Sequence, residues 1–134
     1  MLFRSSPAGW DKVVVPRGGH FAQQGRTVQT FGIKRMTRCL AALKDEFETE
    51  SRRFHFIGHQ ANLRMLENVC RRCQIPPEQH HYNVDWYGNT AAASSASVLS
   101  MHWEKWRPED DVAVVGVGGG LTWARALIRF GGRG

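Results

Sequence analysis

Apolar residues recur at the spacing of a helix in three parts of the chain. Over residues 27–48 they return at helical intervals with charged residues between them, which predicts a long amphipathic helix. The same pattern predicts a second helix over residues 61–73, which Pro76 and Pro77 end. A third helix is predicted over residues 91–106, and the small side chains of its first half let it approach its neighbours closely.

Short apolar runs between these helices predict strands. They lie at residues 54–58, 82–84, 112–117 and 121–130. Within the Gly-, Pro- and Arg-rich residues 1–26, the apolar run at 13–15 reads as a loop or short strand followed by a turn. The glycines at 118–120 predict a tight turn, so the last two strands should be antiparallel. Because strands and helices alternate along the chain, the expected fold class is α/β with a mostly parallel sheet.

Composition and charge narrow the classes of protein to consider. The 134 residues fit one domain, and three cysteines, an odd and sparse count, favour a reducing compartment over a disulfide framework. Since there is no apolar leader and no run of about 20 apolar residues, we expect a soluble, cytoplasmic protein. The net charge of +6 favours anionic partners, or it reflects only a basic solvated surface.

Polar residues with chemical potential follow the predicted strands. His59 lies between a strand and a helix, where a neutral imidazole can donate one hydrogen bond, or it is a structural histidine. Asn89 lies in a Gly-Asn-Thr turn, where its amide can donate as well, or it serves the turn alone. Together the two side chains can form an oxyanion hole, and the glycines at 118–120 let backbone N–H groups approach a ligand.

Three motifs in this order resemble a known family. His-Gln-Ala-Asn-Leu-Arg at 59–64, Gly-Asn-Thr-x-Ala-Ala-Ser at 88–94 and Gly-Gly-Gly-Leu-Thr-Trp at 118–123 resemble β-ketoacyl–acyl carrier protein synthase III, of the thiolase superfamily. Residues 1–19 resemble the tail of the preceding half with its connecting loop, and residues 20–134 the C-terminal domain. The resemblance implies the C-terminal half of a thiolase-like fold, with a mixed, mostly parallel five-stranded sheet flanked by helices.

The resemblance also implies an activity. The family condenses acyl-CoA with malonyl–acyl carrier protein, with loss of carbon dioxide, in fatty acid or polyketide biosynthesis. It implies no metal and no permanently bound cofactor. The expected partners are acyl carrier protein, acyl-CoA, and an N-terminal synthase half or a homodimer partner, with neither nucleic acid nor a membrane.

Roles follow for residues of this chain that match the motifs. The resemblance implies that His59 and Asn89 bind the malonyl thioester oxygen and stabilise the enolate formed on decarboxylation. Gly119 would offer its backbone N–H to the oxyanion of the acyl-enzyme, and Asn62 and Gly25 would bind the pantetheine arm. The carrier protein would dock on Gln60, Ala61, Asn62, Leu63 and Arg64, with the arginine facing acidic carrier residues.

The chain departs from the family pattern at four positions. Gln29 and Thr30 stand where an aromatic and a basic residue are usual, Trp86 replaces a commonly basic residue, and Val117 stands where a phenylalanine often precedes the glycines. These departures leave the predicted donor pair in place. They bear on substrate preference and on the contacts with CoA and the carrier.

None of the three cysteines matches the nucleophile of the family, which lies at a helix amino terminus where the helix dipole lowers its pKa. Cys39 falls inside the first predicted helix. Cys70 and Cys73 fall on the second, at a CxxC spacing that fits a zinc site only weakly, because no second pair exists, and otherwise fits core positions on one helix face.

Two hypotheses account for a domain with the motifs but no nucleophile. The first is a truncated or split synthase, in which a separate chain supplies the first half. The second is a non-catalytic subunit that pairs with an active condensing enzyme. Nucleic-acid binding rests on charge alone. The chain alone is expected to be inactive, and it should expose an apolar face that promotes self-association.

Overall fold

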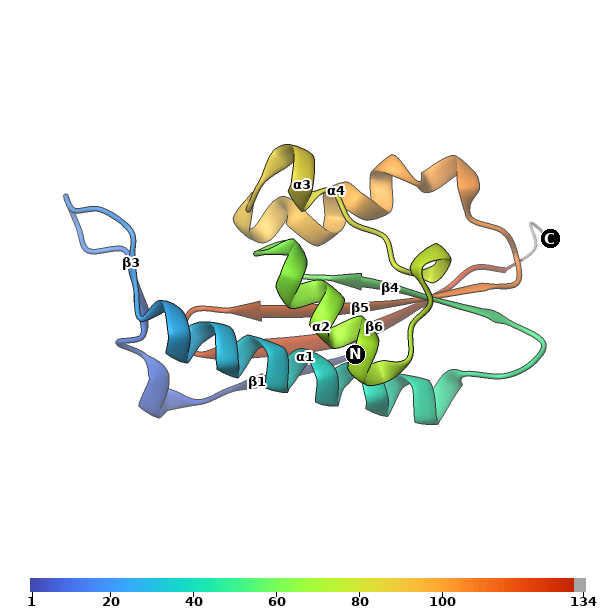
Figure 1. Cartoon of the computed structure of the whole chain (residues 1–134), viewed down its shortest axis with the longest axis horizontal. Helices are drawn as coiled ribbons and strands as arrows, with labels where there is room; N and C mark the ends of the chain where they lie inside the picture. The colour runs from blue at the N-terminus through green and yellow to red at the C-terminus, as the bar shows by residue number, and fades with distance from the viewer. Residues whose placement is uncertain (132–134) are drawn as a thin grey trace.

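A mixed four-stranded sheet in the order β1-β6-β5-β4 forms the centre of the structure, a computed structural model that describes residues 1–131 (Figure 1). β4 (Arg53–Gly58) and β5 (Asp110–Gly118) are parallel. β6 (Thr122–Arg129) is antiparallel to β5, and β1 (Leu2–Ser5) is antiparallel to β6.

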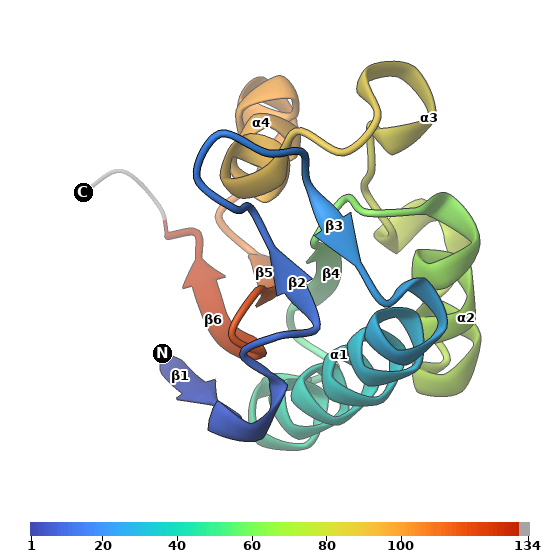
Figure 2. The same cartoon turned by 90° about the vertical axis from the view of Figure 1, so that its left-hand side faces the viewer.

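Helices cover both faces of this sheet. α1 (Gly25–Phe47) and α2 (Leu63–Cys73) lie on one face, and α4 (Ser94–Met101) lies on the other, as the end-on view shows (Figure 2). In the short helix α3 (Val84–Tyr87), Val84 packs against the core cluster of α1 and α2. A small hairpin of β2 (Val13–Val14) and β3 (Ala22–Gln23) lies across one end of the molecule. Single 3-10 turns occupy Pro7–Gly9, Pro77–Gln79, Ala91–Ala93 and Trp103–Lys105.

Alternation along β4 divides the core between the two faces. Phe54 and Phe56 pack into the larger cluster, which includes residues of α1 and α2 such as Leu40 and Leu66. Ile57 points to the opposite face and packs against Val98 of α4. Since the side chains of a strand alternate between faces, β4 contributes to the core on both sides of the sheet.

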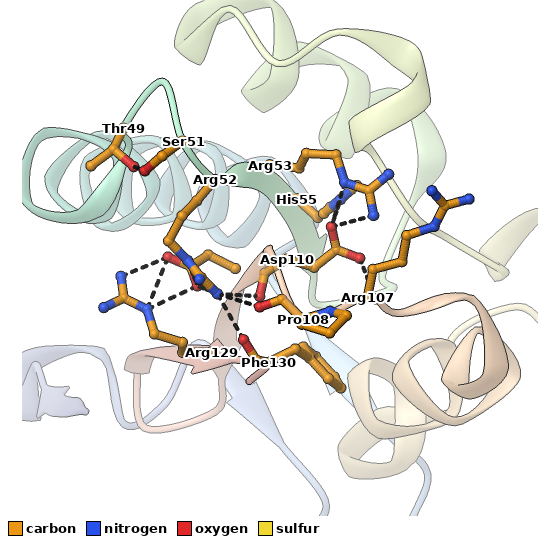
Figure 3. A network of polar contacts seen from close by, with 11 residues as sticks. Thr49, Ser51, Arg52, Arg53, His55, Arg107, Pro108, Asp110, Arg129 and Phe130 are labelled. Atoms are coloured by element: carbon orange, nitrogen blue, oxygen red, sulfur yellow. Dashed lines mark hydrogen bonds and ion pairs between the residues drawn. The ribbon is translucent and has the colours of Figure 1, made fainter. Parts of the chain in front are cut away.

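Two buried aspartates at the start of β5 join the strands at the end of the sheet that is remote from Gly58 (Figure 3). Arg52 Nε and Arg129 Nη2 each lie 2.8 Å from the Asp111 carboxylate, while Asp110 binds Arg53 and His55. Burial alone would raise the pKa of the Asp111 carboxyl, but hydrogen bonds from the two arginines outweigh it and lower that pKa.

The sheet differs from the expected five-stranded, mostly parallel one. Within residues 1–131 the main sheet has four strands, and one of its three neighbouring pairs is parallel. The strand expected at 82–84 is absent, and the chain beside β4 makes only a single bridge between Phe56 and His80. The reason is local, because the backbone N–H groups of Asn83 and Val84 donate to a side chain, and α3 starts there.

Helix α4 is also shorter than the helix predicted over residues 91–106. At its start, Ala91 has a positive φ of 53°, which a continuous α-helix does not permit. At its end the chain folds back, and Trp106 Nε1 donates to Leu99 O at 3.2 Å. The other predicted helices and strands are confirmed, as is the antiparallel pairing of the last two strands.

Residues 1–19 do not form a separate unit. Residues 2–5 form β1, which pairs with β6 at the edge of the main sheet, and the Ser6 N–H donates to Leu121 O at 2.8 Å. This pairing does not test the expected boundary at residue 19, which stays a prediction. The expected domain end at 134 lies outside the described residues. None of the helices in residues 1–131 has the length and apolar character needed to cross a membrane.

Candidate active site

An open hollow of about 860 Å³ lies where β4 and β5 end. Six of the predicted site residues line it, from the β4–α2 loop, the start of α1, the Gly88–Ala91 turn and the β5–β6 turn: His59, Ala61, Asn62, Gly25, Asn89 and Gly119. The part of the lining that β5 and β6 contribute, its floor, includes the small residues Gly116, Ala124 and Ala126 beside Val114. The fold thus gathers chemistry from segments far apart in sequence.

His59 is held from two sides. Its backbone N–H donates to Val115 O at 2.8 Å, which extends the pairing of the parallel strands by one residue. Its ring Nδ1 lies 3.1 Å from the Ser94 hydroxyl. Burial lowers the pKa of the imidazole, so the ring is neutral near pH 7.

Asn89 occupies a turn with unusual backbone geometry on both sides. Gly88 has φ 66° and ψ −159°, and Ala91 has φ 53°. The Asn89 Oδ1 accepts the Ala91 N–H at 2.9 Å. Because the side-chain oxygen is bound within the turn, the amide NH2 group is the part left to act on a molecule in the hollow. Non-glycine residues with positive φ are concentrated at functional sites, and Ala91 fits that pattern.

Gln60 does not lie where a carrier-binding residue would be expected. Its side chain is 0% exposed, and its amide Nε2 donates to Gly58 O at 2.7 Å. Its Oε1 accepts the N–H groups of Asn83 and Val84 at 3.0 and 3.2 Å. The structure does not support a direct contact with a carrier, because the residue is fully used inside the protein as a link between the β4–α2 loop and α3.

The rest of the predicted docking segment lies at or near the surface. Asn62 caps the amino terminus of α2, where its Oδ1 accepts the Met65 N–H at 3.3 Å. Ala61 and Leu63 are half-buried, and Arg64 is exposed on the first turn of the helix. The Gly119 carbonyl accepts the Thr122 hydroxyl at 3.0 Å, and an added Cβ at Gly25 would meet no atom within 4 Å.

The sequence departures divide between the hollow and the surface. Gln29 and Val117 line the hollow. Trp86 is 84% exposed on α3, away from the core. Arg125 is the one charged side chain among the described residues that line the hollow, and its guanidinium lies 3.8 Å from Glu46. The site therefore offers uncharged donors to a ligand in largely apolar surroundings.

All three cysteines are buried in the core and none lines the hollow. Burial raises the pKa of the Cys70 thiol to about 12, and the Cys73 thiol contacts the Thr37 carbonyl at 3.5 Å. No group of three or more potential metal ligands occurs within residues 1–131. The CxxC pair therefore has the position of ordinary core residues.

Sequence reasoning missed the role of Ser94. It was part of a recognised motif, but nothing in a run of alanines and serines indicated which hydroxyl would reach the histidine. Ser95 was missed in the same way, and its hydroxyl donates to Gly58 O at 3.2 Å.

Comparisons with known proteins show the family of the chain. Residues 49–130 match the family model described as 3-oxoacyl-[acyl-carrier-protein] synthase III C terminal. A β-ketoacyl-[acyl-carrier-protein] synthase III of Staphylococcus saprophyticus is 35% identical over 120 residues, covering 87% of this chain and 38% of the relative. One from a Roseiflexus species is 45% identical over 76 residues, covering 55% of this chain and 23% of the relative.

Solved structures give the same result. The synthase III of Thermus thermophilus has a TM-score of 0.88 at 28% identity, covering 98% of this chain and 46% of that one. The enzyme of Pseudomonas aeruginosa has a TM-score of 0.83 at 26% identity, covering 97% and 43%. The chain thus spans less than half the length of these relatives, with the C-terminal half of a thiolase-like fold. It belongs to the 3-oxoacyl-[acyl-carrier-protein] synthase III C-terminal family.

Proposed function

We propose that this domain is the enolate-stabilising half of a condensing site. It binds the thioester of a malonyl group and promotes its decarboxylation, and a second half with a cysteine nucleophile supplies the acyl group. The observation that carries the proposal is that His59 and Asn89 line one hollow, each with one polar atom bound inside the protein and a nitrogen left over. Two such N–H donors are what a developing oxyanion requires.

The chemistry needs no charged base. The malonyl thioester oxygen accepts hydrogen bonds from His59 Nε2 and Asn89 Nδ2. As the bond to the carboxylate carbon breaks, its electron pair moves into the enolate and carbon dioxide leaves. The enolate carbon then attacks the acyl thioester of the other half, whose cysteine thiolate is the leaving group. The Gly119 N–H stabilises the oxyanion formed in that attack.

The surroundings favour this reaction over simple protonation. Small floor residues leave room for a thioester, and the largely apolar lining strengthens hydrogen bonds to a negative oxygen. A neutral histidine also cannot hand a proton to the enolate carbon as readily as an imidazolium could. The lowered pKa of His59 keeps it in that neutral form.

The carrier contact belongs to the exposed first turn of α2. Arg64 is exposed there beside Asn62, which lines the hollow. A malonyl group delivered on a pantetheine arm passes this rim. We expect Arg64→Glu to raise the KM for malonyl–acyl carrier protein, while the KM for malonyl-pantetheine stays unchanged. An equal rise in both KM values would show that Arg64 does not contact the carrier protein.

Release of carbon dioxide from malonyl thioester tests the proposal without requiring an acyl group. The chain is assembled with a cysteine-bearing half whose nucleophile is replaced, and His59→Ala or Asn89→Ala is introduced. Each change should slow decarboxylation roughly 100-fold, the usual loss for one oxyanion donor. The matched control is Asn68→Ala, which removes an exposed amide bound to Arg72 on α2. Decarboxylation that survives both site changes would favour a non-catalytic subunit instead.

A further inference from the structure

Ser94 lies behind the His59 ring at the start of α4. The serine is 1% exposed, so its hydroxyl is cut off from bulk water. The oxygen lies 3.1 Å from His59 Nδ1 and accepts the Gln60 backbone N–H at 3.3 Å. These are the two hydrogen bonds of the Ser94 hydroxyl within the described residues.

Counting hydrogens decides which atom donates. The Gln60 amide is always a donor, so it occupies a lone pair of the Ser94 oxygen. The hydroxyl proton of Ser94 then needs an acceptor, and His59 Nδ1 is the acceptor within reach. If Nδ1 carried a proton, two hydrogens would face each other and a buried hydroxyl would lack a partner, which is costly.

A helical serine often has another choice, the carbonyl four residues earlier. Ser94 begins α4, and within the described residues its hydroxyl bonds to His59 and Gln60 and not to the Thr90 carbonyl. The start of the helix thus leaves the hydroxyl directed at the histidine. The contact joins segments 35 positions apart in sequence.

We propose that Ser94 is a positioning residue that holds His59 in the neutral tautomer with its proton on Nε2. In that tautomer Nδ1 is an acceptor and Nε2 is the donor available to a molecule in the hollow. An imidazolium is disfavoured for the same reason, because it would place a proton on Nδ1. Burial acts in the same direction and lowers the pKa of His59.

The chemical consequence rests on the proposed function, but the assignment of the tautomer does not. The residues around the ring are uncharged: Gln60 beside it in the chain, Ser94 at Nδ1, and Asn62 and Asn89 in the lining of the hollow. The charged group that lines the hollow, Arg125, is paired with Glu46. A change in the titration of His59 on altering Ser94 therefore reports on the hydroxyl itself.

Nitrogen-15 NMR of the imidazole rings in the histidine-labelled chain tests the proposal. In the native chain, His59 Nδ1 should resonate as an unprotonated nitrogen and Nε2 as a protonated one. Ser94→Ala should shift the tautomer ratio toward Nδ1–H by about fivefold, the effect of losing one hydrogen bond. It should also raise the pKa of His59, and Ser94→Thr should restore both values. Ser100→Ala, at an exposed position of α4, is the matched control.

Either of two results would overturn the proposal. One is a native His59 with its proton on Nδ1, which is readable even if Ser94→Ala fails to fold. The other is a folded Ser94→Ala chain with the native tautomer and native pKa. Loss of decarboxylation in His59→Ala is measured separately. The tautomer assignment can thus stand or fall independently of the proposed reaction.

Discussion

At the scale of single residues, one polar atom of each proposed donor side chain is bound inside the protein. The Asn89 oxygen is bound by the Ala91 N–H, and the His59 Nδ1 is bound by the Ser94 hydroxyl. Each contact fixes the orientation of a side chain that would otherwise rotate. Preorganised donors of this kind stabilise developing charge without reorganising during the reaction.

A substitution at Gly88 tests how strongly the backbone of the turn fixes the position of the Asn89 side chain. The φ of 66° and ψ of −159° at Gly88 lie in a region that is essentially restricted to glycine, although an added Cβ would meet no atom within 4 Å. Gly88→Ala should therefore cost about 1–3 kcal/mol in backbone strain alone and slow decarboxylation by displacing Asn89. Gly131→Ala, which lacks a positive φ, is the control. Native activity and a native unfolding midpoint in Gly88→Ala would contradict this reading.

A second prediction concerns acid. Burial lowers the pKa of both His80 and His81 to about 4, with His102, His55 and Lys105 adding to the effect at His81. Unfolded histidines titrate near 6.5, so the unfolded chain binds more protons below that pH. The free energy of unfolding should be fully present above about pH 6.5 and fall toward pH 4.

Urea denaturation across this pH range gives the check. His81→Gln removes one of the rings with a lowered pKa and should flatten the pH dependence. An exposed histidine replaced in the same way, His20→Gln, should leave the pH dependence as it is. A free energy of unfolding that does not change between pH 6.5 and 4 would be incompatible with two half-buried histidines that stay neutral in the folded chain.

Residue chemistry was predictable from sequence only in part. His59 and Asn89 could be singled out because they lie in motifs just after strands, where α/β sheets expose their loops. The partners of these residues could not be predicted, since Ser94 reaches His59 across 35 positions. The burial of Gln60 could not be predicted either: the family resemblance placed it in a docking segment, and its side chain is buried.

At the scale of elements, Gln60 links the loop that carries His59 to the helix that precedes Asn89. It accepts two N–H groups at the start of α3 and donates to the end of β4. Because the Asn83 and Val84 N–H groups donate to Gln60, they are not available to pair with a strand, and residues 82–84 form none. Helical periodicity predicted α1 and α2 well because each buries a continuous apolar face. It did not predict α3, whose start depends on hydrogen bonds to the side chain of Gln60.

Gln60→Ala should destabilise the chain by roughly 2–5 kcal/mol, because it leaves a cavity and two backbone N–H groups, those of Asn83 and Val84, without partners. Gln60→Glu keeps the volume but cannot donate to Gly58 O, so it should also destabilise. Gln24→Ala, at an exposed position with no side-chain cap hydrogen bond, is the control. If Gln60→Ala unfolds at the same urea concentration as the native chain, Gln60 is not such a link.

At the scale of the whole molecule, large apolar side chains remain outside the core. Phe3 is 65% exposed and Phe21 is 59% exposed, and both line the hollow. The core itself lies on both sides of the sheet, so this surface is additional to it. An exposed apolar surface around a site generally marks a contact with another protein.

The isolated chain should therefore associate with itself at high concentration, as measured by light scattering. Phe3→Ser and Phe21→Ser together should reduce that association, while Val15→Ser changes an exposed apolar residue that does not line the hollow. Addition of a cysteine-bearing half should also reduce it by covering the same surface. A stable monomer at high concentration, with or without that half, would contradict this expectation.

The most direct measurement of the central claim is condensation by the complete site. The chain is assembled with a cysteine-bearing N-terminal half and supplied with acyl-CoA and malonyl–acyl carrier protein, and the rate of product formation is measured. The account predicts product only when both halves are present, with a loss of roughly 100-fold for His59→Ala and for Asn89→Ala. An assembly that condenses equally well with either change would contradict it.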